Sequence, residues 1–283
     1  IFVDNKVTTM ITPTKTPDLH DFFYPKSIAM IGASDTKGKL GWNVFHNLIS
    51  HDCSTRIYPI NPKCDVIQGV KAYKSLDEID DDIDVAIVLV PASATPLAVE
   101  QCCKHGVRYI VIESAGFAEL GKEGKQAQAQ IKSVLKNYGA RALGPNCSGV
   151  INTHHDMNQA LGIVKDLGKG NVGLVAQAGV YASGILWGLR HIMDFGIVAT
   201  IGNKLDINET DILNHLGNDD NIDVICMYLE DITSGRKFVE VAKEVTGKKP
   251  TIILKSGRTE AGKKAVMSHT ASLAGDDAIN DIA

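Results

Sequence analysis

The chain has 283 residues, of which 44% are hydrophobic and 22% charged, and its 29 Lys and Arg against 33 Asp and Glu give a formal net charge of −4. This composition is that of a folded globular protein and excludes a disordered one. The slight acidic excess argues against a nucleic-acid-binding protein, and no apolar run approaches the roughly 18–20 residues that span a bilayer. A length about twice that of a typical domain of roughly 150 residues predicts two domains.

Strand and helix patterns alternate from residue 27 to the end of the chain. Most strand candidates are continuous apolar runs, which indicates strands covered on both faces. This alternation predicts an α/β fold with one doubly wound parallel sheet in each half and right-handed crossovers. The predicted strands are Ser27–Ile31, Arg56–Ile60, Val85–Val90, Tyr109–Ile112, Asn171–Ala176, Gly196–Ile201, Val224–Leu229 and Thr251–Lys255, and helical patterns cover Pro96–Lys104, Lys125–Asn137, Val180–His191 and Arg236–Val245.

The two halves meet in a stretch rich in Gly, Asn, His and Asp over residues 143–169. We therefore expect an N-terminal lead-in over residues 1–19, a first domain over residues 20–148 and a second domain over residues 149–283. The lead-in lacks the charged-then-apolar layout of a secretory signal.

The cysteines and histidines give no sign of a disulfide framework or a metal site. None of the six cysteines forms a CxxC pair, and the neighbours Cys102–Cys103 could not both pair in an ordinary framework. We expect reduced cysteines in a cytoplasmic protein. The adjacent pair His154–His155 has no cysteine or carboxylate at metal-ligand spacing, so we expect no metal. The last residues look like the start of an amphipathic helix capped by Asp276 or Asp277, so we expect the second domain to be truncated here and the native protein to continue.

A glycine-rich turn follows the first predicted strand. Ile31 runs directly into Gly32-Ala-Ser-Asp-Thr-Lys-Gly38-Lys-Leu-Gly41, and a helical pattern comes next. A strand that ends in such a turn before a helix brings backbone N–H groups and the positive helix end together, which makes a site for an anion. The spacing G-x5-G-x2-G differs from the G-x-G-x-x-G of dinucleotide folds. A purely structural turn is the ordinary alternative.

The residues after the second strand indicate which anion is bound. Nicotinamide-binding domains carry an acid there for the ribose hydroxyls, whereas this chain has Tyr58-Pro-Ile-Asn-Pro-Lys63. Lys63, together with Lys37 and Lys39 of the first turn, suits an extra phosphate better than a free ribose diol. The pattern therefore favours an adenosine ligand with additional phosphate, so that coenzyme A fits and NAD fits poorly.

Eight motifs along the chain carry a resemblance to one family. In the first half they are Ile31-Gly-Ala-Ser34, Tyr58-Pro-Ile-Asn-Pro-Lys63, Glu113-Ser-Ala-Gly-Phe117 and Leu143-Gly-Pro-Asn-Cys147, and in the second half Gln177-Ala-Gly179, Gly202-Asn-Lys204, Tyr228-Leu-Glu230 and Ser268-His-Thr-Ala-Ser-Leu-Ala-Gly275. In this order and at these spacings they resemble the succinyl-CoA synthetase superfamily, specifically the α part of ADP-forming acyl-CoA synthetases of the acetate–CoA ligase type. The resemblance implies a Rossmann-like CoA-binding domain followed by a flavodoxin-like domain.

The resemblance also implies where CoA and the acyl group bind. Asn146 would belong to the acyl or active-site loop. The residues that would contact CoA lie in the glycine-rich turn and in the loops after the second and fourth strands, and they are Gly32, Ala33, Ser34, Lys37, Gly38, Asn61, Pro62, Lys63, Ser114, Ala115 and Gly116.

A second anion-binding turn is predicted at the start of the second half. Gly173-Leu-Val-Ala-Gln-Ala-Gly179 is again a strand that runs into a small-residue turn, with a helix beginning near Val180. Gln177, Ala178 and Gly179 are therefore predicted to bind phosphate through main-chain amides. Family members usually have Ser in place of Ala178, so this chain would use backbone donors only. A tight turn that packs the helix onto its strand is the alternative.

Glu230 and His269 are the predicted catalytic residues. Glu230 follows an apolar strand, which places it at the carboxyl edge of a sheet, where open α/β sheets bind ligands. A carboxylate at a helix start is the ordinary alternative, as it is for Asp206, Glu209 and Asp211, which we do not assign to catalysis. His269 lies in a small, hydroxylic segment that matches the family's phosphorylated histidine, and the resemblance implies that Glu230 holds its imidazole ring.

The resemblance implies a reversible reaction in which acyl-CoA, phosphate and ADP give carboxylate, CoA and ATP through an acyl phosphate and a phosphohistidine at His269. CoA would bind this chain, and ADP or ATP with Mg would bind an ATP-grasp β subunit or domain. The small carboxylic acid stays open among acetate, branched, aryl and short hydroxy acids. We expect an oligomer with no membrane or nucleic-acid partner. The alternatives are a CoA-binding regulatory module, which would need neither His269 nor Glu230, and a nicotinamide dehydrogenase, which the Asn61-Pro-Lys63 turn disfavours.

Overall fold

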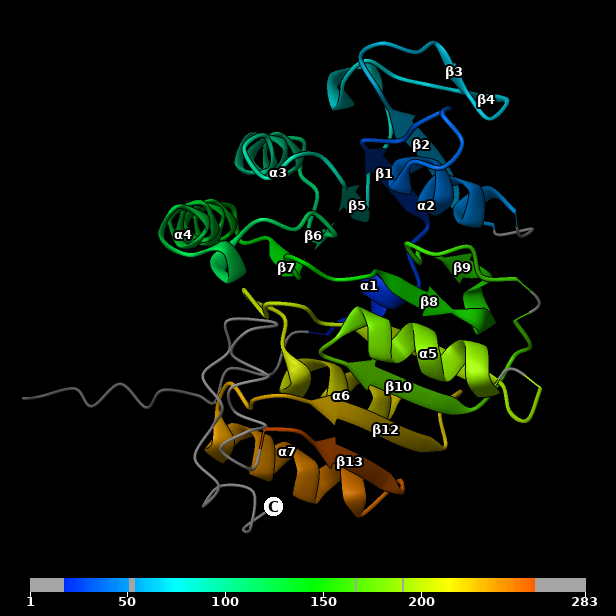
Figure 1. The fold of residues 1–283 in the computed structure, drawn as a ribbon, viewed down its shortest axis with the longest axis vertical. Coiled ribbons are helices and arrows are strands. Elements are labelled where there is room, and N and C mark those ends of the chain that lie inside the picture. Colours follow the sequence, from blue (N-terminus) through cyan, green and yellow to red (C-terminus); the bar gives the residue numbers. More distant parts are fainter. Residues whose placement is uncertain (1–17, 51–53, 166, 190, 258–283) are drawn as a thin grey trace, which may run out of the picture.

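The computed structural model describes residues 18–50, 54–165, 167–189 and 191–257. These residues form two large β-sheets, drawn one above the other in Figure 1. No described helix combines the length and the apolarity that are needed to cross a membrane. The predicted catalytic residue His269 lies outside the described residues.

The first sheet has five parallel strands between two layers of helices (Figure 1). Its elements are α1 (His20–Phe23), β1 (Ser27–Ile31), α2 (Leu40–Ile49), β2 (Arg56–Ile60), β5 (Val85–Val88), α3 (Thr95–Lys104), β6 (Tyr109–Ile112), α4 (Lys122–Tyr138) and β7 (Arg141–Leu143). The strand order is β2-β1-β5-β6-β7. Ile28 and Met30 pack with α1 and α2 on one face, whereas Ala29 packs in the cluster of α3 and α4 on the other. This cover on both faces explains the continuous apolar strands.

The second sheet has four parallel strands and an antiparallel edge. Its elements are β8 (Val150–Asn152), β9 (Met157–Asn158), β10 (Val172–Ala176), α5 (Gly179–Leu189), β11 (Phe195–Thr200), α6 (Glu209–Asn218), β12 (Val224–Leu229), α7 (Gly235–Thr246) and β13 (Thr251–Lys255). The strand order is β13-β12-β10-β11-β8-β9, with β8 antiparallel to β11 and β9 antiparallel to β8. Helix α5 packs on one face, and α6 and α7 pack on the other. The predicted α/β fold with two parallel sheets is therefore confirmed.

The predicted strands agree closely with the observed ones, and five of the eight have the predicted bounds. Strand β5 ends at Val88, two residues early. Strand β10 begins one residue later than predicted, and β11 both begins and ends one residue earlier. The sequence pattern did not indicate α6, the short strands β7, β8 and β9, or the small hairpin of β3 (Val66–Ile67) and β4 (Val70–Lys71).

One apolar cluster runs through both halves of the molecule. It joins Phe22 and Phe45 of the first half to Val175, Met227 and Phe238 of the second, all of them buried. Because the cluster is continuous, the two sheets share part of their core. The predicted domain boundaries at residues 20–148 and 149–283 stay a prediction.

Polar contacts reinforce this shared core. The side-chain amide of Asn47 in α2 donates to the carbonyl oxygens of Ala160 at 2.8 Å and Gly162 at 2.7 Å. Asn152 of β8 donates to the carbonyl oxygen of Phe23 at 2.9 Å. Backbone hydrogen bonds also join the segment at residues 203–207 to residues 142–145, at the edge of the first sheet. The connection after β11 therefore lies against the edge of the first sheet and holds the second half there.

Candidate active site

The turn between β1 and α2 passes very close to the neighbouring backbone. At Gly32, where φ is 100°, a Cβ atom would lie 2.1 Å from the carbonyl oxygen of Leu89, and at Gly41 one would lie 2.2 Å from the carbonyl oxygen of Gly32. Helix α2 begins after Lys39, which makes no side-chain capping hydrogen bond. The first amides of this helix therefore receive no side-chain cap from Lys39, which suits the binding of an anion.

Asn61 holds the loop after β2 against this turn. Its side-chain amide donates to the carbonyl oxygen of Ala33 at 2.8 Å, and its side-chain oxygen accepts from the backbone N–H of Lys63 at 2.9 Å. The side chains of Lys37 and Lys63 are exposed, and the Lys37 ammonium lies 5.9 Å from the ring centre of Trp42. The structure thus brings together two predicted loops and leaves two cationic side chains at their rim.

The loop after β6 lies next to the predicted acyl loop. Ser114 is buried, and its hydroxyl donates to the carbonyl oxygen of Val90 at 2.6 Å. Its own carbonyl oxygen accepts from the backbone N–H of Asn146 at 2.9 Å. The Ser114 side chain therefore fixes the loop, while Ala115 is exposed and the φ of 105° at Gly116 suits glycine.

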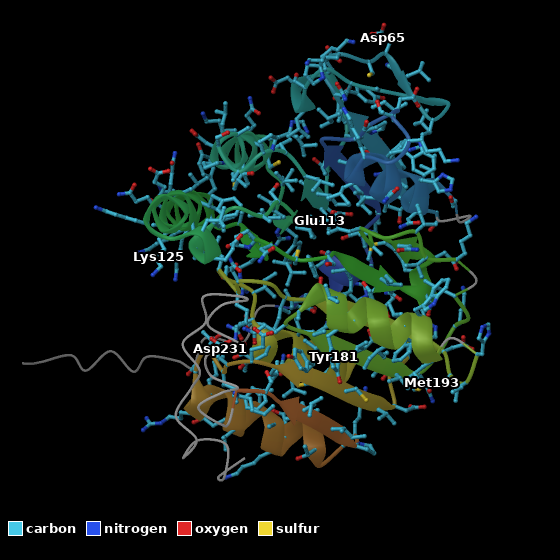
Figure 2. All side chains as sticks on the ribbon, viewed as in Figure 1. Asp65, Glu113, Lys125, Tyr181, Met193 and Asp231 are labelled. Atoms are coloured by element: carbon cyan, nitrogen blue, oxygen red, sulfur yellow. The ribbon has the colours of Figure 1, made fainter. Side chains whose placement is uncertain are left out.

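Glu113, one residue earlier, is a fully buried carboxyl group where the two halves meet (Figure 2). Neither of its side-chain oxygens has a hydrogen-bond partner among the described residues. Burial holds the pKa of this carboxyl well above its ordinary value. At Gly149 a Cβ atom would lie 2.7 Å from the Glu113 Oε1 atom, so glycine at that position leaves room for the carboxyl group.

The second predicted anion turn is built at the start of α5. The carbonyl oxygen of Ala178 accepts from the N–H of Tyr181 at 3.1 Å, so Ala178 occupies the capping position but has no polar side chain to offer. A Cβ atom at Gly179 would lie 1.9 Å from the Ser148 hydroxyl oxygen, which means that the helix start packs directly on the loop after Asn146. Because Ala178 offers no side-chain cap, the main-chain amides of this helix start face the region next to the predicted acyl loop.

The Gln177 side chain ties this turn to the end of β12. Its oxygen accepts from the backbone N–H groups of Glu230 at 2.8 Å and Asp231 at 3.2 Å, and its amide nitrogen donates to Asp231 at 2.6 Å. The Lys255 ammonium donates to the carbonyl oxygen of Glu230 at 2.7 Å. Glu230 is buried at the carboxyl edge of the sheet, as expected, and Gln177 holds its backbone. The Gln177 backbone N–H donates to the carbonyl oxygen of Tyr228 at 2.9 Å, so it does not supply the predicted main-chain contact, and the predicted phosphate contacts would come from residues 178–179.

Lys204 is a buried cation to which the sequence patterns assigned no role. Its side chain is 4% exposed and pairs with Asp231 and, at 3.1 Å, with Glu209. Glu209 and Asp211 lie in the first turn of α6, where Asp211 completes a capping box with Asn208, so the helix-start interpretation of these acids is confirmed. The motif Gly202-Asn-Lys204 carried part of the resemblance, but only the fold shows what its side chains contact.

Two further observations concern metal and thiol chemistry. Within the described ranges, no group of three His, Cys, Asp or Glu side chains is arranged to hold a metal ion. The five cysteines in those ranges are free thiols, and burial raises the pKa of Cys103 to about 11. These cysteines pack in the apolar clusters and lie in none of the predicted binding loops except Cys147.

Comparisons with known proteins identify the origin of this arrangement. Residues 26–153 match the family described as the CoA binding domain, and residues 169–283 match the succinyl-CoA ligase like flavodoxin domain. The chain belongs to the succinyl-CoA synthetase superfamily, as a relative of the α part of ADP-forming acetate–CoA ligases.

Individual relatives cover nearly the whole chain. The ADP-forming acetate–CoA ligase of Methanocaldococcus jannaschii is 44% identical over 92% of this chain, which spans 36% of that protein. The α subunit of acetate–CoA ligase I from Pyrococcus furiosus is 41% identical over 92% of this chain, which spans 57% of that subunit. A solved structure of the dinucleotide-forming acetyl-coenzyme A synthetase 1 of Ca. Korarchaeum cryptofilum, in complex with phosphate and ADP, superimposes with a TM-score of 0.88 at 35% identity, covering 93% of this chain and 57% of that one. The chain thus corresponds to part of each of these longer proteins.

Proposed function

We propose that this chain is the CoA-binding and phosphohistidine-bearing part of an NDP-forming acyl-CoA synthetase. In the degradative direction, a phosphate oxygen attacks the acyl carbonyl carbon, the carbon–sulfur bond breaks, and acyl phosphate and CoA form. A ring nitrogen of His269 then attacks the phosphorus atom and releases the carboxylate. A β-phosphate oxygen of ADP finally takes the phosphoryl group from His269, which gives ATP.

The observation that carries this proposal is the position of two helix starts whose N-cap residues, Lys39 and Ala178, make no side-chain cap or have no polar side chain to make one. The start of α2 lies by the turn at residues 32–41, and the start of α5 packs against Ser148, on the loop that leads from one half to the other. Helix starts stabilise phosphate groups without a counter-ion. CoA phosphates at α2 and a transferring phosphate at α5 would therefore place the acyl group between them, near Asn146.

The residues present also fit the ligands chemically. The close approach of backbone at Gly32 and Gly41 gives an anion access to main-chain amides, and Lys37 and Lys63 can neutralise the additional phosphate of CoA. Glu230, held at the sheet edge, is suited to bind one ring nitrogen of His269, which leaves the lone pair of the other free to attack. ADP with Mg would bind a partner ATP-grasp unit, as the relationship to ADP-forming ligases suggests.

The direct test follows phosphate in the full-length protein together with its nucleotide-binding unit. Acetyl-CoA, phosphate and ADP should give ATP, and mass spectrometry should locate an acid-labile phosphate on His269. His269→Ala should abolish ATP formation while leaving CoA affinity nearly unchanged. A regulatory module would bind CoA without any ATP formation across a panel of acyl-CoA substrates. Full turnover by the alanine variant would remove His269 from the reaction.

A further inference from the structure

The turn at Gly202–Lys204 lies where the two predicted binding regions meet. It follows β11, and both Gly202 and Lys204 have left-handed backbones, with φ values of 54° and 53°. A Cβ atom at Gly202 would lie 2.3 Å from the carbonyl oxygen of Pro145, and the N–H of Asn203 donates to that same oxygen at 2.9 Å. The turn is therefore packed directly on the predicted acyl loop.

The Asn203 side chain reaches the predicted CoA loop through one carboxylate. Its amide donates to Glu119 Oε2 at 2.6 Å, while Glu119 Oε1 accepts from the backbone N–H of Gly116 at 2.6 Å and of Phe117 at 3.0 Å. Burial alone would raise the pKa of Glu119, but these hydrogen bonds hold it below its ordinary value. A residue of the second half thus fixes the orientation of the Gly116 amide in the first half.

The Lys204 side chain reaches in the opposite direction, to the loop that carries Glu230. Besides its ion pairs with Asp231 and Glu209, the ammonium donates to the carbonyl oxygen of Asp231 at 3.0 Å. Glu209 in turn accepts from the backbone N–H of Thr233 at 2.6 Å. Figure 2 places Asp231 just beyond the end of β12. One buried cation and its two carboxylates therefore fix the chain from Glu230 to Thr233.

A buried ion pair of this kind gains little stability, because desolvation of the charges offsets most of their attraction. These ion pairs instead restrict the positions of the Lys204 ammonium and of the Asp231 and Glu209 carboxylates, because each group must lie close to its partners. Adjacent residues Asn203 and Lys204 therefore act on two loops from one rigid turn. Reacting groups that are misplaced by about 1 Å slow a reaction by about a hundredfold, so a fixed distance between the two loops matters to the chemistry.

We propose that Asn203 and Lys204 are positioning residues. They hold the predicted CoA loop at residues 114–116 and the loop that carries Glu230 at a fixed distance from each other. Asn203 acts on Gly116 through Glu119, and Lys204 acts on Glu230 through Asp231. The inference rests on the proposed function, because it assigns those two loops to successive steps of one reaction.

The test separates the contact of Asn203 with Glu119 from the contact of Lys204 with Asp231. It uses the full-length protein with its nucleotide-binding unit. Asn203→Ala removes the bond to Glu119 and should raise the KM for CoA about tenfold with little change in the KM for ADP. Asp231→Asn keeps the shape and the acceptor for Gln177 but removes the charge opposite Lys204, and it should lower kcat about tenfold with an unchanged KM for CoA. Asn171→Ala is the matched control, because it also removes an amide–carboxylate bond, at 2.7 Å to Asp223, but at the amino-terminal end of β10.

The decisive result is a raised KM for CoA in Asn203→Ala together with a lowered kcat in Asp231→Asn. A merely structural role would lower the melting temperature of both variants and change KM and kcat to similar extents. Wild-type kinetics in both variants, or equal losses in both and in the control, would overturn the inference. If the unmodified protein neither binds CoA nor forms ATP, the proposed function itself fails. A variant of Lys204 is avoided, because it would leave the carboxylate of Glu209 buried without its cation.

Discussion

The side-chain amide of Gln177 donates to a carboxylate oxygen of Asp231 at 2.6 Å, and its oxygen accepts from the backbone N–H of Glu230 at 2.8 Å. These bonds join the carboxyl ends of β10 and β12, two strands that pair in register along the sheet. The Gln177 side chain, to which the sequence assigned no role, thus supports the predicted catalytic glutamate.

Gln177→Ala should slow phosphoryl transfer much more than it weakens phosphate binding. The variant keeps the main-chain amides of residues 178–179 but releases the backbone of Glu230, so we expect transfer to slow by about tenfold to a hundredfold. Single-turnover labelling with acyl phosphate gives the rate, and equilibrium binding of inorganic phosphate gives the affinity. Unchanged transfer together with weakened phosphate binding would assign the side chain to phosphate instead.

Gly179→Ala should destabilise the protein, because its methyl group meets the Ser148 side chain. Overpacking of this kind costs about 1–3 kcal/mol in the free energy of unfolding. Ser148→Gly in the same chain should restore most of the loss, since it removes both side-chain atoms that crowd the added methyl group. Gly184→Ala in the same helix is the control, and with no atom within 4 Å of the added group it should stabilise the helix by about 1 kcal/mol. Urea unfolding measures all four proteins.

Lys63→Ala should weaken CoA more than dephospho-CoA. The loop that carries Lys63 is held against Ala33 by Asn61, so its ammonium can reach a phosphate on the adenosine part of the ligand. Loss of one charge-assisted contact costs about 1.5–3 kcal/mol, roughly a tenfold to a hundredfold change in affinity. Calorimetry with both ligands checks the difference, with the exposed Lys243→Ala as a control. Equal losses for the two ligands would exclude this role.

Glu113→Gln should change how stability depends on pH. An unfolded glutamate loses its proton near pH 4.3, about its unperturbed value, whereas the folded protein keeps that proton to a higher pH. The folded state therefore binds more protons above that pH, and stability falls as the pH rises towards the folded pKa, by at most about 1.4 kcal/mol per pH unit.

The glutamine variant lacks this proton, so its stability relative to the unmodified protein should rise with pH over the same window. Urea unfolding at a series of pH values measures the difference, with Glu123→Gln, at an exposed position of α4, as the control. A constant offset for Glu113→Gln would contradict a raised pKa.

The strands were predictable because most are continuous apolar runs, and β5, β6, β10 and β11 are buried along their whole length. Tyr109–Ile112 and Val224–Leu229 are apolar runs with polar residues at their ends, and both have the predicted bounds. Strand β9 was not predictable, because two residues are too few to show a period. Helix α6 was missed for another reason. A helix start at Glu209 and Asp211 was only an alternative in the sequence, and the capping box of Asn208 and Asp211 shows it in the structure.

The site was predictable where one loop carries the pattern and unpredictable where two distant loops meet. The glycine-rich turn at residues 32–41 can be recognised because strand, glycines and helix follow one another. The contacts of Asn203 with Glu119 and of Lys204 with Asp231 join residues far apart in the chain. No spacing in a single sequence shows such pairs, and the one available signal was the presence of Gly202-Asn-Lys204 among the family motifs.

The apolar cluster that joins Phe45 to Phe238 has a consequence for recombination between relatives. A crossover placed at residue 148 would give Asn47 of one parent the backbone of Ala160 and Gly162 from the other. It would also separate Tyr24 from Asp219, whose carboxylate accepts the tyrosine hydroxyl at 2.8 Å. The two halves therefore behave as matched parts, and a hybrid with this crossover will fold well only when its two parents carry compatible residues at these contacts.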